Sequence, residues 1–542
     1  MTVGSQSFKA IFLRYNLHIR DRISIYPGIF SWILTITILV SFAILNISWH
    51  KLAIPDTPEI DGYFFQADRI LNGEAYQDLY HPPLFTLLTA NFSRLLGVNT
   101  LLAGSLVSAI SVAIFSLLTF WLARYYLVFA YALLAQVLIG IDWLVFRMGV
   151  SAGTDALFAV LALSILLALV IRQKQPDSHT NKTIGTVLLG LLFGLMLLTR
   201  YNALFFLPLV AAGLLLEKKP WWRKVQSSLL FLGIVLLVCA PWLMYNLKFN
   251  GSMFANENWR NLALALYGEN DFSYLDRAPF SGYIDVIAHD PQRTINLWKE
   301  NILFSIGIIP FLHSSSPLLA LLLPLGVITF YKKGEAGKLF LLYFVGCLLS
   351  FGLTFRYYPR FLLPMLPISV LFCSVGLEKL MSAHTKDKRF RIIILDAIII
   401  APLVLTYFFG RQTILAQPKR EVELLNRLVM EGRLYDEKLA VMSTFPYADY
   451  FTNSPESLTY TWVPHYDPNF PKSLVTKAIS EGAEFILVSD RTTIGAIRDG
   501  SIESFVPDCW KIWVSEEDSS GVIRIYHNNC VSPTGQAESS FL

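Results

Sequence analysis

Charged residues are scarce in this sequence. They make up 15% of the 542 residues, and 54% are hydrophobic, whereas a soluble globular chain carries about 25% charged residues. This composition excludes an ordinary soluble enzyme and a disordered chain, and it indicates a membrane protein. Residues 1–410 hold 32 Lys and Arg against 22 Asp and Glu, and residues 411–542 hold 12 against 18. We therefore predict a basic membrane-embedded domain over 1–410 and an acidic α/β domain over 411–542.

Several chemical signatures are also missing. The sequence has no GxxxxGK[ST] phosphate loop, no GxGxxG turn between a strand and a helix, and no His, Cys and Glu spacing typical of a metal site. Only five cysteines occur, and three of them lie in apolar runs as filler. Cys509 and Cys530 flank a predicted hairpin, so they form either a disulfide in an oxidising compartment or two unpaired thiols.

Long apolar runs dominate the first 410 residues. A spanning helix needs roughly 20 mostly apolar residues, and eleven runs approach or meet this length. We therefore predict an α-helical polytopic membrane protein with about 11 spanning helices. The runs cover 27–48, 101–122, 125–142, 155–171, 184–199, 202–216, 227–246, 315–331, 338–355, 361–377 and 392–410. The stretch 301–312 is too short to span and is predicted to be a half-helix or an interfacial segment.

The distribution of Lys and Arg predicts the orientation. These residues cluster before the first run and in alternate short loops, near 172–182, 218–224, 332–338 and 379–391. Short cytoplasmic loops are enriched in Lys and Arg, so we expect the N-terminus and these loops in the cytoplasm. Loops 49–100 and 247–314 and the C-terminal domain then lie on the outer face. A miscount of one span would move the C-terminal domain inside.

The C-terminal domain is predicted to be a small α/β unit. Helices are expected near 418–432 and 472–481, strands at 439–444 and 485–489, and a final hairpin from 510–514 and 522–526. An extracytoplasmic position agrees with the possible disulfide.

Loop 49–100 holds the main catalytic candidate. Asp61 follows the first span and precedes a helix-like pattern, and a carboxylate at the membrane surface can act as a general base toward an acceptor hydroxyl. Asp56, Glu59 and Asp68 are close competitors. The alternative is that Asp61 only caps the helix. Further on, the double proline after His81 forces an extended entry into an amphipathic interfacial helix, where a lone histidine is usually structural.

A second carboxylate lies at the mouth of the fourth span. Asp155 starts this helix, so either a functional role or helix capping explains it. Asp396 lies near the inner end of the last span and is interpreted as structural. The acidic triplet 269–271 superficially matches the metal-chelating motif of nucleotide-sugar enzymes, and we interpret it as a loop feature.

Arginines on the outer face oppose the usual charge bias. Arg200 follows a span, and Arg356 and Arg360 flank a Tyr-rich turn. A phosphate or pyrophosphate headgroup explains such residues, because the guanidinium fork fits phosphate oxygens. The alternative is snorkelling beside Tyr357 and Tyr358.

Six short motifs occur in order along residues 30–370. They are Asp61 after the first span, Ala67 to Gly73, His81–Leu84, Thr154–Leu157, Gly194–Tyr201 and Arg360–Pro364. Together they resemble the GT-C type of polyprenyl-phosphate-sugar-dependent membrane glycosyltransferases. The pattern is most similar to the group that contains bacterial aminoarabinose transferases and protein O-mannosyltransferases.

This resemblance implies inverting transfer of a sugar from a polyprenyl-phosphate carrier to a hydroxyl on the outer face. It implies that Asp61 is the catalytic base, that Asp155 and His81 help to bind substrate, and that Arg200, Arg356 and Arg360 hold the carrier phosphate. Two departures leave the acceptor open. Gly62 replaces the second carboxylate of the family's acidic pair, and His81 stands where many members have Lys.

The implied partners are a polyprenyl-phosphate-linked sugar donor, a lipid, glycan or protein acceptor, and membrane lipids, with no nucleic acid. A divalent metal is possible, but no ligand motif indicates one. The expected location is the plasma (inner) membrane of a bacterium. Transfer of a whole oligosaccharide is disfavoured, because Arg223 follows Trp221-Trp222 where a Trp-Trp-Asp run would be expected. The competing classes are a transporter or flippase of a lipid-linked substrate, and a scaffold that displays the C-terminal domain.

Overall fold

The computed structural model describes most of the helical domain and the framework of the C-terminal domain. The described residues are 26–49, 63–76, 78–174, 179–215, 217, 220–267, 278–308, 317–331, 335–353, 359–384, 398–400, 403–404, 406–407, 419–433, 438–442, 459–463, 472–480, 482–489, 506–518 and 521–529. Asp61, Arg356, Asp396, Cys530 and the triplet 269–271 lie outside them, so the interpretations of these residues stay predictions.

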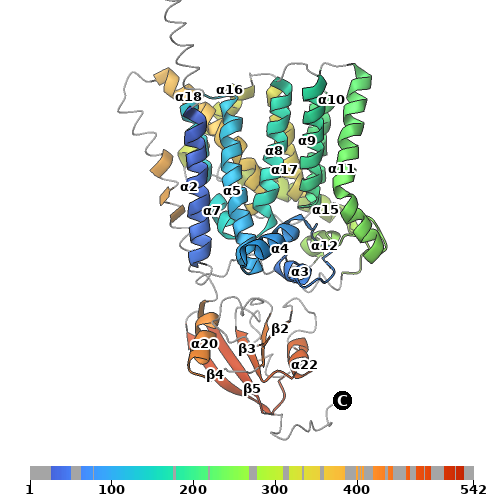
Figure 1. The fold of residues 1–542 in the computed structure, drawn as a ribbon, viewed down its shortest axis with the longest axis vertical. Coiled ribbons are helices and arrows are strands. Elements are labelled where there is room, and N and C mark those ends of the chain that lie inside the picture. The colour runs from blue at the N-terminus through green and yellow to red at the C-terminus, as the bar shows by residue number, and fades with distance from the viewer. Residues whose placement is uncertain are drawn as a thin grey trace, which may run out of the picture.

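The N-terminal domain is a bundle of long helices (Figure 1). The helices that run through the bundle are α2 (Tyr26–Trp49), α5 (Thr100–Arg124), α6 (Phe129–Gly140), α7 (Trp143–Val150), α8 (Thr154–Lys174), α9 (His179–Leu197), α10 (Leu207–Leu215), α11 (Trp221–Asn250), α16 (Pro317–Tyr331), α17 (Glu335–Gly352) and α18 (Leu366–His384). Two 3-10 turns, η1 (Tyr201–Phe206) and η3 (Pro359–Met365), precede α10 and α18.

Shorter helices gather at one end of the bundle, and Figure 1 shows α3, α4 and α12 together there. They are α3 (Tyr63–Leu71), α4 (Leu84–Leu96), α12 (Trp259–Tyr267), α14 (Tyr283–His289) and α15 (Pro291–Ile308). We call this end the outer end, following the predicted orientation. Helix α3 agrees with the helix-like pattern expected after Asp61, and α15 shows that the short stretch at 301–312 begins as part of a helix.

Within the described residues, five helices are long and apolar enough to cross a membrane, or six when one bent pair counts as a span. Several of the other predicted runs form shorter apolar helices, and the count of eleven stays a prediction. The single span expected over 125–142 is corrected. Helix α6 ends at Gly140 and α7 continues at an angle of 55°. The break occurs because the Asp142 side chain accepts hydrogen bonds from the backbone N–H groups of Leu144 (2.9 Å) and Val145 (3.4 Å) and so caps a new helix.

The bundle has a buried centre and lipid-facing edges. The apolar windows of α5 and α8 are 72% and 78% buried, whereas those of α2 and α11 are 22% buried. Without a hydrophobic driving force between helices in lipid, small residues and polar contacts hold such bundles together. Accordingly Gly326 on α16 lies so close to α18 that an added Cβ would meet the Phe372 carbonyl oxygen at 1.8 Å.

Two buried polar clusters fasten helices to one another. On α6, the buried Gln136 amide accepts from the Ser31 hydroxyl (2.7 Å) and donates to the Thr35 hydroxyl (3.0 Å), which fixes α2. At the end of α8 opposite to Thr154, Arg172 donates from Nε to Glu217 (2.5 Å), and Lys182 Nζ lies 3.7 Å from the same carboxylate oxygen. This inner cluster joins the ends of α8, α9 and α10.

The C-terminal domain is a five-stranded mixed sheet with strand order β2-β1-β3-β5-β4. Its strands are β1 (Lys438–Met442), β2 (Thr459–Val463), β3 (Phe485–Ser489), β4 (Trp510–Asp518) and β5 (Gly521–Asn528). The pairs β1–β2 and β1–β3 are parallel, whereas β3–β5 and β4–β5 are antiparallel.

Two helices cover the two faces of this sheet. Helix α20 (Lys419–Met430) packs against Phe485 and Leu487, and α22 (Lys472–Ser480) packs against Ile486 and Val488. Both faces of β3 are covered because successive side chains of a strand point to opposite faces of the sheet. The predicted helices, the strands β1 and β3, and the final hairpin are confirmed, and β2 was missed.

The domain lies beyond the outer end of the bundle (Figure 1). One apolar cluster includes Tyr63 and Phe85 of the outer helices together with Leu424 and Leu428 of α20. Cys509 is disulfide-bonded, which agrees with the first of the two alternatives for this residue.

Candidate functional site

Three ends of helical elements meet at the outer end of the bundle. Helix α8 begins at Thr154 and carries Asp155 in its first turn. Arg200 adopts an extended conformation between α9 and η1, with φ −152° and ψ 135°. Arg360 is the second residue of η3. Because each residue sits where a helix starts or stops, its side chain can reach beyond the apolar helix flanks.

Asp155 brings the two arginines together. Its Oδ1 lies 2.9 Å from Arg200 Nη2, and its Oδ2 lies 4.0 Å from Arg360 Nε. The three side chains are 8%, 15% and 21% exposed respectively, so this ion cluster is largely removed from solvent. Both guanidinium groups also lie over the Phe361 ring, at 5.7 Å and 5.2 Å from its centroid. Among the described residues, the cluster holds two cations and one carboxylate.

Thr154 and Tyr63 extend this cluster toward the outer loop. Arg200 Nε donates to Thr154 Oγ1 at 2.6 Å, and Tyr63 Oη lies 3.1 Å from the same hydroxyl. Tyr63, at the start of α3, is fully buried. Its ring packs on Phe85 of α4 and on His81, with centroid distances of 5.3 Å and 4.6 Å. The first turn of α3 therefore connects the arginines to the loop that precedes α4.

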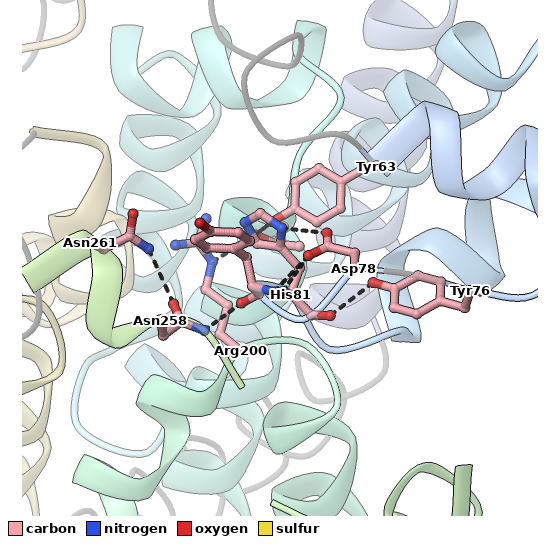
Figure 2. Close-up of polar contacts among 9 residues, drawn as sticks. Tyr63, Tyr76, Asp78, His81, Arg200, Asn258 and Asn261 are labelled. Atoms are coloured by element: carbon pink, nitrogen blue, oxygen red, sulfur yellow. Dashed lines mark hydrogen bonds and ion pairs between the residues drawn. The ribbon is translucent and has the colours of Figure 1, made fainter. Parts of the chain in front are cut away.

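Asp78 and His81 form a pair inside that loop (Figure 2). His81 Nδ1 lies 2.7 Å from Asp78 Oδ2. The other oxygen, Oδ1, accepts hydrogen bonds from the backbone N–H groups of Tyr80 (2.7 Å) and His81 (3.1 Å). The Asp78 side chain is 9% exposed, so its charge is satisfied by these contacts rather than by bulk water. An aspartate that bonds to the following backbone in this way stabilises a turn.

Further hydrogen bonds fix the backbone of the loop. Tyr76 Oη donates to the His81 carbonyl at 2.8 Å, and Asn258 donates to the Tyr80 carbonyl. Leu84 N donates to the Leu198 carbonyl at 2.9 Å, which ties the start of α4 to the end of α9. Burial and the nearby charge of Asp78 raise the pKa of Tyr76 well above its usual value, so its hydroxyl remains a donor. These three hydrogen bonds, together with the contacts of Asp78, fix the loop.

A small pocket opens beside the arginine cluster. Asp155 and Arg360 both line it, so charged groups face a space between α7, α8 and η3. The remaining lining residues are small or apolar, and they are Met148, Ser151, Ala152, Gly153 and Ala156.

The structure brings together four of the six predicted site residues. Asp155, Arg200 and Arg360 form one cluster, and His81 reaches it through Tyr63 and Thr154. The other two, Asp61 and Arg356, lie outside the described residues. Across the described part of the chain, no group of three His, Cys, Asp or Glu side chains could hold a metal ion.

Sequence reasoning missed three participants. Tyr63 carried no chemical signal, because a tyrosine is ordinary at a helix start, and Thr154 was noted only as part of the motif Thr154–Leu157. Asp78 offered a signal, since it stands three residues before His81, but the loop shape that turns this spacing into a contact was not apparent.

Comparison with known proteins finds a shared fold and a family match over part of the chain. Residues 80–245 match the family described as dolichyl-phosphate-mannose-protein mannosyltransferase. The chain is a membrane glycosyltransferase, and its fold is that of the GT-C type. The matched segment of this glycosyltransferase contains His81, Asp155 and Arg200, whereas Arg360 lies beyond it. No curated protein sequence matched the chain.

Solved structures agree with this fold. ArnT from Cupriavidus metallidurans in the apo state is 12% identical with a TM-score of 0.57, covering 91% of this glycosyltransferase and 97% of ArnT. The same enzyme bound to undecaprenyl phosphate is 13% identical with a TM-score of 0.54 over the same shares. The archaeal oligosaccharyltransferase AglB from Archaeoglobus fulgidus is 12% identical with a TM-score of 0.51, covering 91% and 74%.

Proposed function

We propose that this glycosyltransferase transfers a single sugar from a polyprenyl-phosphate carrier to a hydroxyl group on the outer face of the membrane, with inversion at the anomeric carbon. The observation that carries the proposal is the convergence of Arg200 and Arg360 on Asp155 at the outer ends of apolar helices. A lipid carrier places its phosphate at this depth, where the hydrocarbon region ends.

The arginine cluster suits a phosphate. Guanidinium groups match phosphate oxygens with paired donors, and Asp155 holds both groups in place before the ligand arrives. Each of the cluster's two guanidinium groups can attract an anion. The family match and the ArnT structure with undecaprenyl phosphate support a polyprenyl phosphate as the carrier.

The reaction needs a base and a stabilised leaving group. In the proposed mechanism Asp61 takes the proton from the acceptor hydroxyl, and the oxygen attacks the anomeric carbon opposite to the phosphate. The bond between this carbon and the phosphate oxygen breaks, and its electron pair leaves with the phosphate. Arg200 and Arg360 stabilise the charge that develops there, and direct displacement inverts the configuration.

The acceptor is a hydroxyl of a lipid, a glycan or a protein, and the donor arrives through the membrane. We assign the enzyme to the inner membrane of a bacterium, with the N-terminus in the cytoplasm and the C-terminal domain outside. The position of the C-terminal domain at the site end of the bundle supports one common side for both (Figure 1).

The test uses membranes that contain the full-length protein and a panel of radiolabelled polyprenyl-phosphate sugars. Wild type should transfer label to an acceptor, and Asp61→Asn should abolish transfer without affecting membrane insertion. Asp285→Asn is the matched control, because this carboxylate is exposed on the outer loop and bonds to Ser281. Near-normal transfer by Asp61→Asn would overturn the assignment of the base.

The phosphate contact has its own test. Arg200→Gln and Arg360→Gln should each raise the KM for the donor about 10-fold or more, as expected for the loss of a charge-assisted hydrogen bond of about 1.5–3 kcal/mol. Arg293→Gln is the control, since this arginine is exposed on the outer loop over Tyr267. Unchanged donor affinity in both variants would refute the phosphate role. Movement of intact donor across vesicles without transfer would instead favour the transporter or flippase.

A further inference from the structure

Two tryptophans at the start of α11 are exposed to the surroundings of the bundle. Helix α11 begins at Trp221, after Pro220, and runs toward the outer loops, so its first turn lies at the end of the bundle opposite to the arginine cluster (Figure 1). We call this the inner end. Trp221 and Trp222 are 70% and 59% exposed. Tryptophan is enriched where a membrane meets water, because its ring is apolar and its N–H is polar. The first turn of α11 therefore marks the inner surface of the membrane.

Basic residues flank these tryptophans on both sides. The sequence places lysines at 218–219 before them and Arg223 and Lys224 after them. The Arg223 guanidinium lies 5.0 Å from the centroid of the Trp222 ring, so the ring holds this cation at the helix surface. Lys224 Nζ donates to the Leu215 carbonyl at 2.6 Å, and the other protons of its ammonium group can bind a further acceptor. Both cations are therefore held in place and still have donors to offer.

In the part of the chain that the structure describes, these two cations have no carboxylate partner. Neither Arg223 nor Lys224 forms an ion pair there. Glu217, the acid that stands closest to them in the sequence, is buried and paired with Arg172 and Lys182. An anion from outside the protein can therefore bind at this turn without displacing a carboxylate of the chain.

An apolar stripe continues from the charged turn along α11. Every third or fourth residue after Trp222 is apolar and exposed, which places these side chains on one face of the helix. They are Val225, Leu229, Leu232 and Leu236. A lipid acyl chain can lie along this stripe while its headgroup stays at the first turn. The order of charged turn and apolar stripe is thus the order of headgroup and chain in a lipid.

We propose that the first turns of α11 bind a phospholipid with an anionic headgroup, whose phosphate contacts Arg223 and Lys224 and whose acyl chain lies along the apolar stripe. Guanidinium and ammonium groups both bind phosphate, and basic residues beside a spanning helix attract anionic lipids. The site lies on the outside of one helix, where the lipids that fill the bilayer contact the protein. It is separate from the groups assigned to the polyprenyl phosphate, which lie at the outer end, and it does not depend on the transfer reaction.

The experiment measures which lipid lies against Trp221 and Trp222. Full-length protein is placed in phosphatidylcholine vesicles that contain a minor share of brominated phosphatidylglycerol or brominated phosphatidylcholine, because bromine quenches tryptophan fluorescence on contact. The double variant Trp221→Phe with Trp222→Phe gives the signal of the other tryptophans, which is subtracted. Brominated phosphatidylglycerol should quench the remaining signal more strongly than brominated phosphatidylcholine at the same share. Equal quenching would overturn the proposal, since the helix would then contact the bilayer without selecting a headgroup.

Charge variants test the two cations. Arg223→Gln should lower the preference for phosphatidylglycerol about 5-fold, and Arg223→Gln with Lys224→Gln should lower it about 30-fold. The exchange Arg223→Lys with Lys224→Arg keeps both charges and should keep the preference, which separates loss of charge from a folding defect. Lys248→Gln is the matched control, because this lysine lies over the Phe249 ring at the other end of the same helix. An unchanged preference after removal of both charges would overturn the site.

Competition identifies the class of lipid. Unlabelled phosphatidylglycerol should relieve the quenching, and undecaprenyl phosphate at the same share should relieve it less. Stronger relief by undecaprenyl phosphate would overturn the assignment to a phospholipid. Raised salt should weaken the preference, since exposed charges are screened, and a preference that salt leaves unchanged would contradict a charge-based site. None of these measurements requires sugar transfer, so their outcome is independent of the proposed function.

Discussion

Replacement of Asp155 by Asn should change turnover and donor binding in opposite directions. Asp155 is the negative group between Arg200 and Arg360, and its side chain is 8% exposed. Asp155→Asn removes one negative charge from the cluster, so the donor phosphate meets less competition for the arginines. The donor KM should therefore stay constant or fall.

The turnover number should fall for a geometric reason. Asp155 fixes Arg200 through a contact of 2.9 Å and orients Arg360 at 4.0 Å. A hydrogen bond to a charged group is worth about 1.5–3 kcal/mol, and 1.4 kcal/mol corresponds to a factor of ten. If the lost contact stabilises the transition state more than it stabilises the bound substrate, kcat should fall about 10- to 100-fold.

The assay is the initial rate of sugar transfer at varied donor concentration in membranes with matched amounts of inserted protein. Asp290→Asn is the control, because this carboxylate lies on the outer loop, where it accepts a hydrogen bond from the Arg293 backbone N–H. An unchanged kcat would refute the view that Asp155 positions the arginines. If the donor KM also rose, Asp155 would instead contact the donor.

Three further predictions concern stability, read as the midpoint of thermal unfolding in detergent. Glu217→Gln leaves Arg172 as a buried charge without its carboxylate, so it should destabilise by about 3–5 kcal/mol; a variant as stable as wild type would contradict this cluster. Gly326→Ala forces a Cβ onto the Phe372 carbonyl and should cost at least about 1–3 kcal/mol, whereas a harmless substitution would mean the helices separate freely. Gln136→Leu should cost only about 1–2 kcal/mol, because hydrogen bonds between membrane helices are weak, and a larger loss would refute that estimate.

Hydropathy and charge predicted the helical domain and the C-terminal α/β unit well. Apolar runs of spanning length leave few alternatives to helices, because lipid offers the backbone no hydrogen-bond partners. The run over 125–142 ends at the break, and the second helix of the bent pair, α7, was missed because it is only 8 residues long. A single capping carboxylate, Asp142, produces the 55° bend, and hydropathy averages over such a residue. Strand β2 was missed although its Thr-Tyr-Thr-Trp-Val sequence is rich in β-branched and aromatic residues, which favour strands.

The candidate site was predictable only in part. Asp155, Arg200 and Arg360 stood out because charge at the outer mouths of apolar helices is costly. Their convergence depends on how α8, η1 and η3 pack, which no local pattern in the sequence encodes. The pairing of Asp78 with His81 depends likewise on a turn that Asp78 builds with its own backbone contacts.

Helix α11 links this site to the thickness of the bilayer. Its 30 residues extend about 45 Å at 1.5 Å per residue, whereas the hydrocarbon core is about 30 Å thick. The helix must therefore tilt or protrude, and the tilt changes with the length of the lipid chains. Near its outer end, Tyr245 donates to the Tyr76 carbonyl at 2.7 Å, and Tyr76 holds the His81 carbonyl. We therefore expect lipid acyl-chain length to act on the His81 loop, and turnover in vesicles of graded thickness would measure this mechanical coupling.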